Sequence, residues 1–235
     1  MHLVRWTQLA LAAAITFACI GCGKKSAESP AASGETAASA QSQVTASAVV
    51  TPTSATRVVP PRAKPVDPMV VLHTTLGDIT IQLFVEKAPR TVENFLTNYA
   101  QRGFYDQTIF HHHEPGVMLI AGGYTADLER KPARSPIYNE SRNGISNRRG
   151  TIAMIRDPET PHSATSEFFF NLADNESFDF KKADEEDLPG YCVFGEVKQG
   201  MDVVDRIAQL STVAKGDFTN IPSPAVSIAS VQRLQ

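Results

Sequence analysis

The segment that decides the fold is Phe110-His111-His112-His113-Glu114-Pro115-Gly116-Val117-Met118-Leu119-Ile120-Ala121-Gly122-Gly123-Tyr124. Two expected strands, 108–112 and 117–121, lie largely within it. Side chains alternate across a strand, so His111 and His113 are expected to point away from His112. The segment therefore combines strand patterning with three adjacent imidazoles and a pair of glycines.

Regular patterning extends outward from this segment to the C-terminus. Further strands are expected at 69–75, 79–84, 151–156, 168–172, 191–198 and 225–234, each a short apolar or alternating run. A first helix should begin at Pro89, bury Val92, Phe95, Leu96 and Tyr99, and end near Gly103. A second helix should begin at Asp202 as its cap and bury Val203, Val204, Ile207 and Leu210. Many short strands with two separated helices indicate a closed antiparallel barrel or a sandwich, and spacing alone does not choose between them.

Five blocks of sequence in the same order carry a resemblance that makes this choice. They are the opening segment, Lys87–Phe95, Arg149–Met154, His162–Phe169 and Gly190–Val197. Together they resemble the bacterial subgroup of cyclophilin-type peptidyl-prolyl cis-trans isomerases. The resemblance implies a mainly β domain over residues 67–235, built as a closed eight-stranded antiparallel barrel with two capping helices.

The resemblance also implies a substrate site. The catalytic position, usually arginine in this family, is His112. The expected substrate-binding residues are Val117, Met118, Ile120, Arg156, Glu167, Phe169, Phe178 and Tyr191, with Ile120 and Glu167 standing where the family usually has glutamine. Ordinary core packing is the alternative for the apolar members, and a surface salt bridge is the alternative for Arg156.

Isomerisation of an X–Pro bond is slow because rotation breaks amide resonance, a barrier of about 18–20 kcal/mol. The reaction needs no cofactor, only tighter binding of the twisted amide, whose nitrogen lone pair is freed for a hydrogen bond. Imidazole has at most two donors against the five of guanidinium, and it is largely neutral above its usual pKa of about 6.5. Replacement of arginine by His112 therefore predicts reduced activity.

The replacements at His112 and Glu167 occur at positions that adjoin in the family fold. We hypothesise a hydrogen bond between these two residues that raises the pKa of His112. Activity would then depend on pH between about 5 and 8.

The expected function is peptidyl-prolyl isomerisation on proline-containing peptides and unfolded exported proteins. The alternative is a catalytically weak or inactive module that binds proline peptides as a chaperone or scaffold. A metal site on His111, His112 and His113 is a third possibility, since His-x-His places two imidazoles on one face of a strand. No acidic or cysteine ligand follows at a motif spacing, so the prediction is that no metal is bound.

The N-terminus predicts export. Residues 1–21 resemble a signal peptide, with His2 and Arg5 before an apolar run, and Ile20-Gly21-Cys22 resembles a bacterial lipobox in which Cys22 is lipidated. Alternatives are Cys19 as the lipidated residue, an ordinary secretory signal and a retained transmembrane anchor. Residues 22–66, rich in Ala, Ser, Thr and Pro, predict a disordered tether. The expected location is the bacterial cell envelope, with the membrane bound through the lipid.

Composition limits the remaining partners. The net charge of −3 gives no basic field for nucleic acid, and we expect a monomer. After processing at Cys22, only Cys192 would remain as an unmodified cysteine. It lies in an apolar run and is predicted to be a small buried hydrophobic residue. The charged run 181–187 predicts a solvated loop.

Overall fold

The computed structural model describes residues 66–184 and 187–234. The predicted signal peptide, Cys22 and almost all of the predicted tether lie outside these residues. No helix in the described part of the chain is both long enough and apolar enough to cross a membrane.

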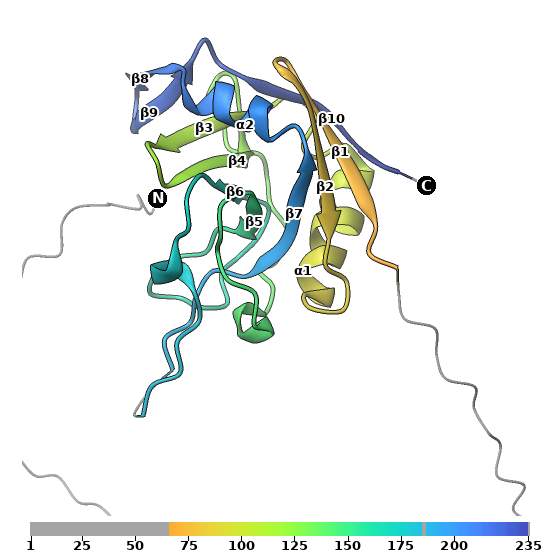
Figure 1. Ribbon diagram of the computed structural model, residues 1–235. Helices are drawn as coiled ribbons and strands as arrows, with labels where there is room; N and C mark the ends of the chain where they lie inside the picture. The colour runs from red at the N-terminus through yellow and green to blue at the C-terminus, as the bar shows by residue number, and fades with distance from the viewer. Residues whose placement is uncertain (1–65, 185–186, 235) are drawn as a thin grey trace, which may run out of the picture. The chain divides into compact units, whose positions relative to one another are not determined.

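Eight strands close into an antiparallel barrel, which confirms the predicted fold class (Figure 1). Their order around the barrel is β1-β10-β3-β4-β6-β5-β7-β2. The strand bounds are β1 Met69–Thr74, β2 Gly77–Leu83, β3 Thr108–Glu114, β4 Met118–Thr125, β5 Thr151–Met154, β6 Phe168–Asn171, β7 Val193–Gln199 and β10 Ser227–Arg233.

Two helical segments cover the barrel interior. The first runs from α1 (Pro89–Glu93) through η1 (Asn94–Tyr99) to η2 (Ala100–Arg102), and it ends at Gly103, as predicted. Gly103 has the left-handed conformation. The second is α2 (Met201–Ala208), which buries Val203, Val204 and Ile207. Its N-cap is Gly200, so the prediction that Asp202 caps this helix is wrong, and Asp202 lies inside the first turn.

A small hairpin lies outside the barrel and was not predicted. Its strands are β8 (Ser211–Lys215) and β9 (Phe218–Ser223), which pair only with each other. Every residue of β8 is exposed, so this strand has none of the alternation between apolar and polar residues by which half-buried strands are recognised.

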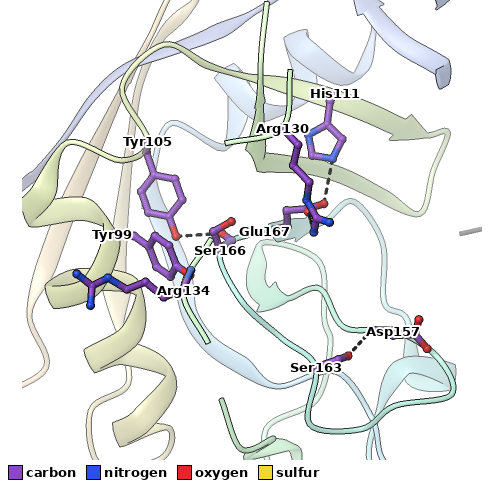
Figure 2. Close-up of polar contacts among 9 residues, drawn as sticks. All are labelled: Tyr99, Tyr105, His111, Arg130, Arg134, Asp157, Ser163, Ser166 and Glu167. Atoms are coloured by element: carbon purple, nitrogen blue, oxygen red, sulfur yellow. Dashed lines mark hydrogen bonds and ion pairs between the residues drawn. The ribbon is translucent and has the colours of Figure 1, made fainter. Parts of the chain in front are cut away.

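Aromatic rings fill the barrel interior around Phe95. The ring of Phe95 lies 5.1 Å from that of Tyr105, 5.6 Å from that of Phe168 and 5.3 Å from that of Phe194, measured between centroids. The hydroxyl of Tyr105 is fully buried and donates to the carbonyl of Ser166 at 3.0 Å, so the polar atom of this core ring is satisfied (Figure 2). Helix and strands thus share one core.

A second apolar cluster lies on the other face of the sheet. It contains Met118, Ile120, Ala153, Phe169 and Val193, and Val117, Phe178 and Tyr191 pack against it half-buried. Neighbours such as Leu119 and Phe170 belong to the interior core instead. Because side chains alternate across a strand, the second cluster faces outward from the barrel. We call it the outer apolar face.

Candidate functional site

Strand register places the predicted catalytic residue on the outer apolar face. His112 is paired with Ile120, Ile120 with Phe169, Phe169 with Ala153, and Ala153 with Val193. Directly paired residues in antiparallel strands share a face, so these five side chains form one row across four strand pairs. The row brings the imidazole of His112 beside a floor that is almost fully buried.

Aromatic side chains form the rim of this face. The ring of Phe169 meets those of Phe178 and Tyr191 edge-on, at centroid distances of 5.9 and 5.5 Å, and the last two rings lie 5.3 Å apart. Phe169 is fully buried, whereas Phe178 and Tyr191 are partly exposed. Edge-to-face packing fixes such rings relative to one another. The structure therefore brings together the predicted apolar site residues, including Val117 and Met118.

His112 is held as a neutral imidazole at neutral pH. Its side chain is 22% exposed, and its Nε2 atom lies 3.7 Å from Oε2 of Glu114. Burial lowers the pKa of His112, and repulsion from His111 lowers it further, against the opposing effect of Glu114. The imidazole therefore presents one N–H donor above the usual pKa of about 6.5.

The hypothesised pairing of Glu167 with His112 is wrong. Oε2 of Glu167 lies 3.4 Å from Nε2 of His111, and Oε1 accepts a hydrogen bond from Nη2 of Arg130 at 3.0 Å (Figure 2). Burial by itself raises the pKa of Glu167, but the combined effects of His111 and Arg130 hold it below its usual value. The expected rise in the pKa of His112 is also wrong, because its actual neighbour Glu114 does not outweigh burial.

A β-bulge explains why the histidines were misplaced. Phe110 pairs with Ala121 and His112 with Ile120, so β3 has one extra residue, His111, between these pairs. His111 contacts Glu167, which by alternation shares the outward side with Phe169. His111 therefore lies on the same side of the sheet as His112, contrary to the predicted alternation.

The third histidine faces a different region. His113 is paired with the interior residue Leu119 and lines a hollow with Leu172, Asp205 and Gln209. His111 instead packs against Tyr124 and Phe218. Because His111 and His113 have separate surroundings, the strand does not present the His-x-His pair that the metal alternative requires. Within residues 66–184 and 187–234, no group of three metal-ligating side chains is found.

The guanidinium of Arg156 binds the protein's own backbone. It donates to the carbonyls of Gly190 (3.1 Å), Asp157 (2.8 Å) and Pro158 (3.0 Å), and also to that of Pro189. It also lies 4.9 Å from the centroid of the Tyr191 ring. Among the described residues, its contacts are with backbone carbonyls and an aromatic ring, and no carboxylate forms the salt bridge that the alternative requires. Its contacts fix the segment that carries Tyr191.

Two groups of residues at this site were missed by sequence reasoning. Arg130 follows β4 in a tight turn, in which Lys131 N donates to Gly123 O at 2.9 Å. Four polar residues, Asn147, Asn171, Asn175 and Asp179, hydrogen-bond to one another and to the backbone beside the outer apolar face. The only available signal was an unusual density of asparagines between 139 and 175.

Comparison with known proteins gives consistent results. Residues 69–233 match the family model described as cyclophilin type peptidyl-prolyl cis-trans isomerase/CLD. Peptidyl-prolyl cis-trans isomerase B of Escherichia coli is 47% identical over 165 residues, covering 69% of this chain and 98% of that protein. Peptidyl-prolyl cis-trans isomerase A of Dickeya dadantii is 43% identical over 185 residues, covering 79% of this chain and 94% of that protein.

Solved structures share the fold. A crystal structure of a Cryptosporidium parvum cyclophilin-type peptidyl-prolyl cis-trans isomerase superposes with a TM-score of 0.59 at 19% sequence identity. The match covers 72% of this chain and 98% of the other. At this identity the likeness concerns the fold of the barrel domain.

Proposed function

The chain belongs to the cyclophilin-type peptidyl-prolyl cis-trans isomerase family, and on this premise we propose that it isomerises X–Pro bonds of exported proteins with reduced activity. The observation that carries the proposal is the row in which His112 lies beside Ile120 and Phe169. A hydrogen-bond donor and an apolar surface are what the reaction requires, and both lie on one outward face.

The apolar face acts by restraining the proline ring. Phe169, Met118 and Val117 offer a buried floor and a partly exposed edge, against which a five-membered ring can pack. Holding the ring while the preceding residue rotates converts binding energy into the correct orientation for the twisted amide. The outer apolar face is the surface that performs this step.

The donor acts on the amide as it twists. Rotation frees the lone pair of the prolyl nitrogen, and an N–H group near that atom stabilises the twisted state more than either planar isomer. His112 supplies one such group in its neutral form. Loss of a donor at a site of this kind typically costs on the order of 10²-fold in rate, which sets the scale of the expected reduction.

The experiment is NMR exchange spectroscopy on a short peptide containing Ala-Pro, with the purified full-length chain added in catalytic amounts. We expect exchange between the cis and trans signals to accelerate, and the Phe169→Ala variant to abolish the acceleration. Arg102→Gln is the control, because this exposed arginine lies on η2 and donates to the carbonyl of Thr97, remote from the outer apolar face. No acceleration by the wild type would overturn the proposal.

The neutral state of His112 favours a second candidate, a module that binds proline peptides without catalysis. Because Glu114 is its nearest charged partner and burial lowers its pKa, the side chain lacks the fixed charge of arginine. Chemical-shift changes of the peptide on binding, without faster exchange, would favour this candidate. If the peptide shows neither binding nor faster exchange, both candidate functions are excluded.

We also propose that Cys22 is lipidated and tethers the domain to a membrane of the bacterial cell envelope. The support is the apolar run 9–20, which leads directly into Gly21-Cys22. Intact-mass measurement of the chain expressed in a bacterium should show a lipid adduct that the Cys22→Ala variant lacks. An unmodified Cys22, or a soluble and unprocessed chain, would contradict the assignment.

A further inference from the structure

A buried polar network connects the loops around the outer apolar face. Asn147 and Asn171 are fully buried, and Nδ2 of Asn171 donates to Oδ1 of Asn147 at 3.2 Å. Oδ1 of Asn171 accepts from Nδ2 of Asn175 at 2.7 Å. Asn171 lies opposite Met118 in the strand register, so the network begins at the edge of the outer apolar face. Buried polar groups with every partner satisfied hold a single arrangement.

The network binds the backbone of three residues of the outer apolar face. Nδ2 of Asn147 donates to the carbonyls of Phe178 at 3.2 Å and Tyr191 at 3.3 Å, while Nδ2 of Asn175 donates to the carbonyl of Val117 at 3.0 Å. These three residues come from separate segments, and none of them lies within a strand. One backbone hydrogen bond, from the N–H of Tyr191 to the carbonyl of Phe178 at 2.8 Å, joins two of them directly. The side chains of Asn147 and Asn175 then hold this pair and Val117 relative to the surrounding loops.

Asp179 fixes the orientation of the central amide. Its carboxylate accepts from Oγ of Ser146 at 2.6 Å, from the backbone N–H of Asn147 at 2.7 Å and from Nδ2 of Asn147 at 3.0 Å. Burial raises the pKa of Asp179, but these hydrogen bonds outweigh it and hold the pKa below its usual value. The carboxylate therefore stays ionised near neutral pH, and Nδ2 of Asn147 shares its two protons among three oxygens.

We propose that Asn147 is a positioning residue, whose side-chain amide sets the separation of the Phe178 and Tyr191 rings and thereby the fit of the proline ring. This inference rests on the proposed function. Asn147 is fully buried, and its side-chain amide acts on the rim through the carbonyls of Phe178 and Tyr191. The backbone hydrogen bond between Tyr191 and Phe178 and the bond from Arg156 to the carbonyl of Gly190 hold the same segment independently, so loss of the amide should loosen the rim without unfolding the domain.

The effect of a looser rim should fall on binding. The rim residues Phe178 and Tyr191 would contact the proline ring of the substrate in the planar and the twisted states of the amide alike. Their displacement should therefore weaken binding of the two states equally, which raises KM and leaves kcat nearly unchanged. We expect Asn147→Ala to raise the dissociation constant of an Ala-Pro peptide about tenfold, the scale of one lost complementary contact.

The matched control is Asn94→Ala. Asn94 is also almost fully buried and also donates Nδ2 to a backbone carbonyl, that of Thr165 at 2.7 Å, but it lies on η1. Both variants should lower the stability of the full-length chain. Only Asn147→Ala should change the dissociation constant, which separates positioning from general loss of stability.

Two measurements keep this test independent of catalysis. In the free protein, nuclear Overhauser effects between the rings of Phe178 and Tyr191, whose centroids are 5.3 Å apart, should weaken in Asn147→Ala and persist in Asn94→Ala. Line-shape analysis of the peptide then gives its dissociation constant and its exchange rate in the complex. Unchanged ring contacts and an unchanged dissociation constant in Asn147→Ala would overturn the inference.

Failure of the proposed function has a different signature. The wild type would then neither bind nor isomerise the peptide, while the ring contacts in the free protein would still report on the network. If Asn147→Ala does not fold, Asn175→Ala serves instead, because Asn175 is only half-buried and ties Val117. It should raise the dissociation constant by a similar factor, and an unchanged value would likewise count against the network.

Discussion

His112 lies at the proposed catalytic position, but its imidazole offers fewer hydrogen-bond donors than the guanidinium of arginine. Its side chain lies in the row with Ile120 and Phe169, so a longer side chain at this position would extend over the same apolar surface. We predict that His112→Arg raises kcat/KM for an Ala-Pro peptide by about tenfold or more, because guanidinium offers five donors and remains charged. The measurement is NMR exchange or a protease-coupled assay. His112→Gln, which keeps one amide donor function without titrating, is the control and should stay near the wild type. An unchanged rate in His112→Arg would contradict the role of this position.

The titration of His112 distinguishes its true neighbour from the hypothesised one. We predict that Glu114→Gln lowers the pKa of His112 further, because Glu114 opposes the effect of burial. Glu167→Gln should leave the pKa of His112 nearly unchanged, because the Glu167 carboxylate contacts His111 and Arg130. Histidine chemical shifts followed against pH measure both. A larger change in Glu167→Gln than in Glu114→Gln would contradict the observed pairing.

The same pKa direction sets a pH dependence of stability. Burial first, and then His111, lowers the folded-state pKa of His112, while the unfolded imidazole binds a proton at about pH 6.5. The unfolded state therefore binds more protons below that pH, so we predict that the free energy of unfolding is highest above about pH 6.5 and falls toward the lowered pKa. His113, whose pKa burial also lowers, adds in the same direction. Urea unfolding of the wild type and His112→Gln across this range tests the prediction: the variant should lose less stability on acidification, and equal losses would contradict it.

Most elements were predictable because apolar residues gather in short runs or recur at helical spacing. β4 and β6 are buried on both faces and begin as continuous apolar runs, so the sequence predicts the strands but not which residue faces which cluster. The bulge at His111 was not visible, because an extra residue in one strand depends on the partner's register rather than on local composition. The aromatic residues predicted for the site do lie together, whereas the predicted partner of Glu167 was wrong.

The start of α2 shows where composition misleads. Asp202 has the chemistry of a cap, but Gly200 takes that place with φ of 86°. A Cβ on Gly200 would lie 2.2 Å from the carbonyl oxygen of Asp78 on β2. The close approach of a distant strand, rather than local helix preference, therefore decides where the helix begins.

A pair of glycine variants separates this close approach from backbone strain. We predict that Gly200→Ala lowers the free energy of unfolding by about 2–4 kcal/mol, the sum of a left-handed conformation and a steric clash. Gly144→Ala is the control, since Gly144 has φ of 77° but a Cβ added there would meet no atom of the described residues within 4 Å. It should cost only about 1 kcal/mol. Urea denaturation measures both, and equal losses would mean that contact with Asp78 does not matter.

At the scale of the whole domain, the barrel wall separates the interior core from the outer apolar face. The interior cluster joins the helices to the strands, whereas the rim of the outer apolar face is held by loops and their hydrogen bonds. Sequence patterns predict the interior cluster because its residues stand in apolar runs or at helical spacing. They do not predict which asparagine binds which carbonyl across gaps of 31 to 58 residues. Those pairings depend on the closed barrel, which brings the loops together.

Cys192 can report both on unfolding of the domain and on local opening at the rim of the outer apolar face. It follows Tyr191 in sequence, its side chain is buried beside Thr91, and burial raises the pKa of its thiol to about 12. We predict that an aromatic disulfide reagent labels Cys192 only when the domain unfolds, because the reactive thiolate is both rare and inaccessible in the native state. Peptide mass spectrometry of the full chain follows this residue separately from Cys19 and Cys22.

An Ala-Pro peptide at ten times its dissociation constant should slow labelling about tenfold, because only the folded domain binds it. The Phe169→Ala variant, which should not bind, is the control and should show no slowing. Rapid labelling of the native chain would show instead that the segment around Cys192 opens locally, and that the rim of the outer apolar face is less firmly held than its hydrogen bonds indicate.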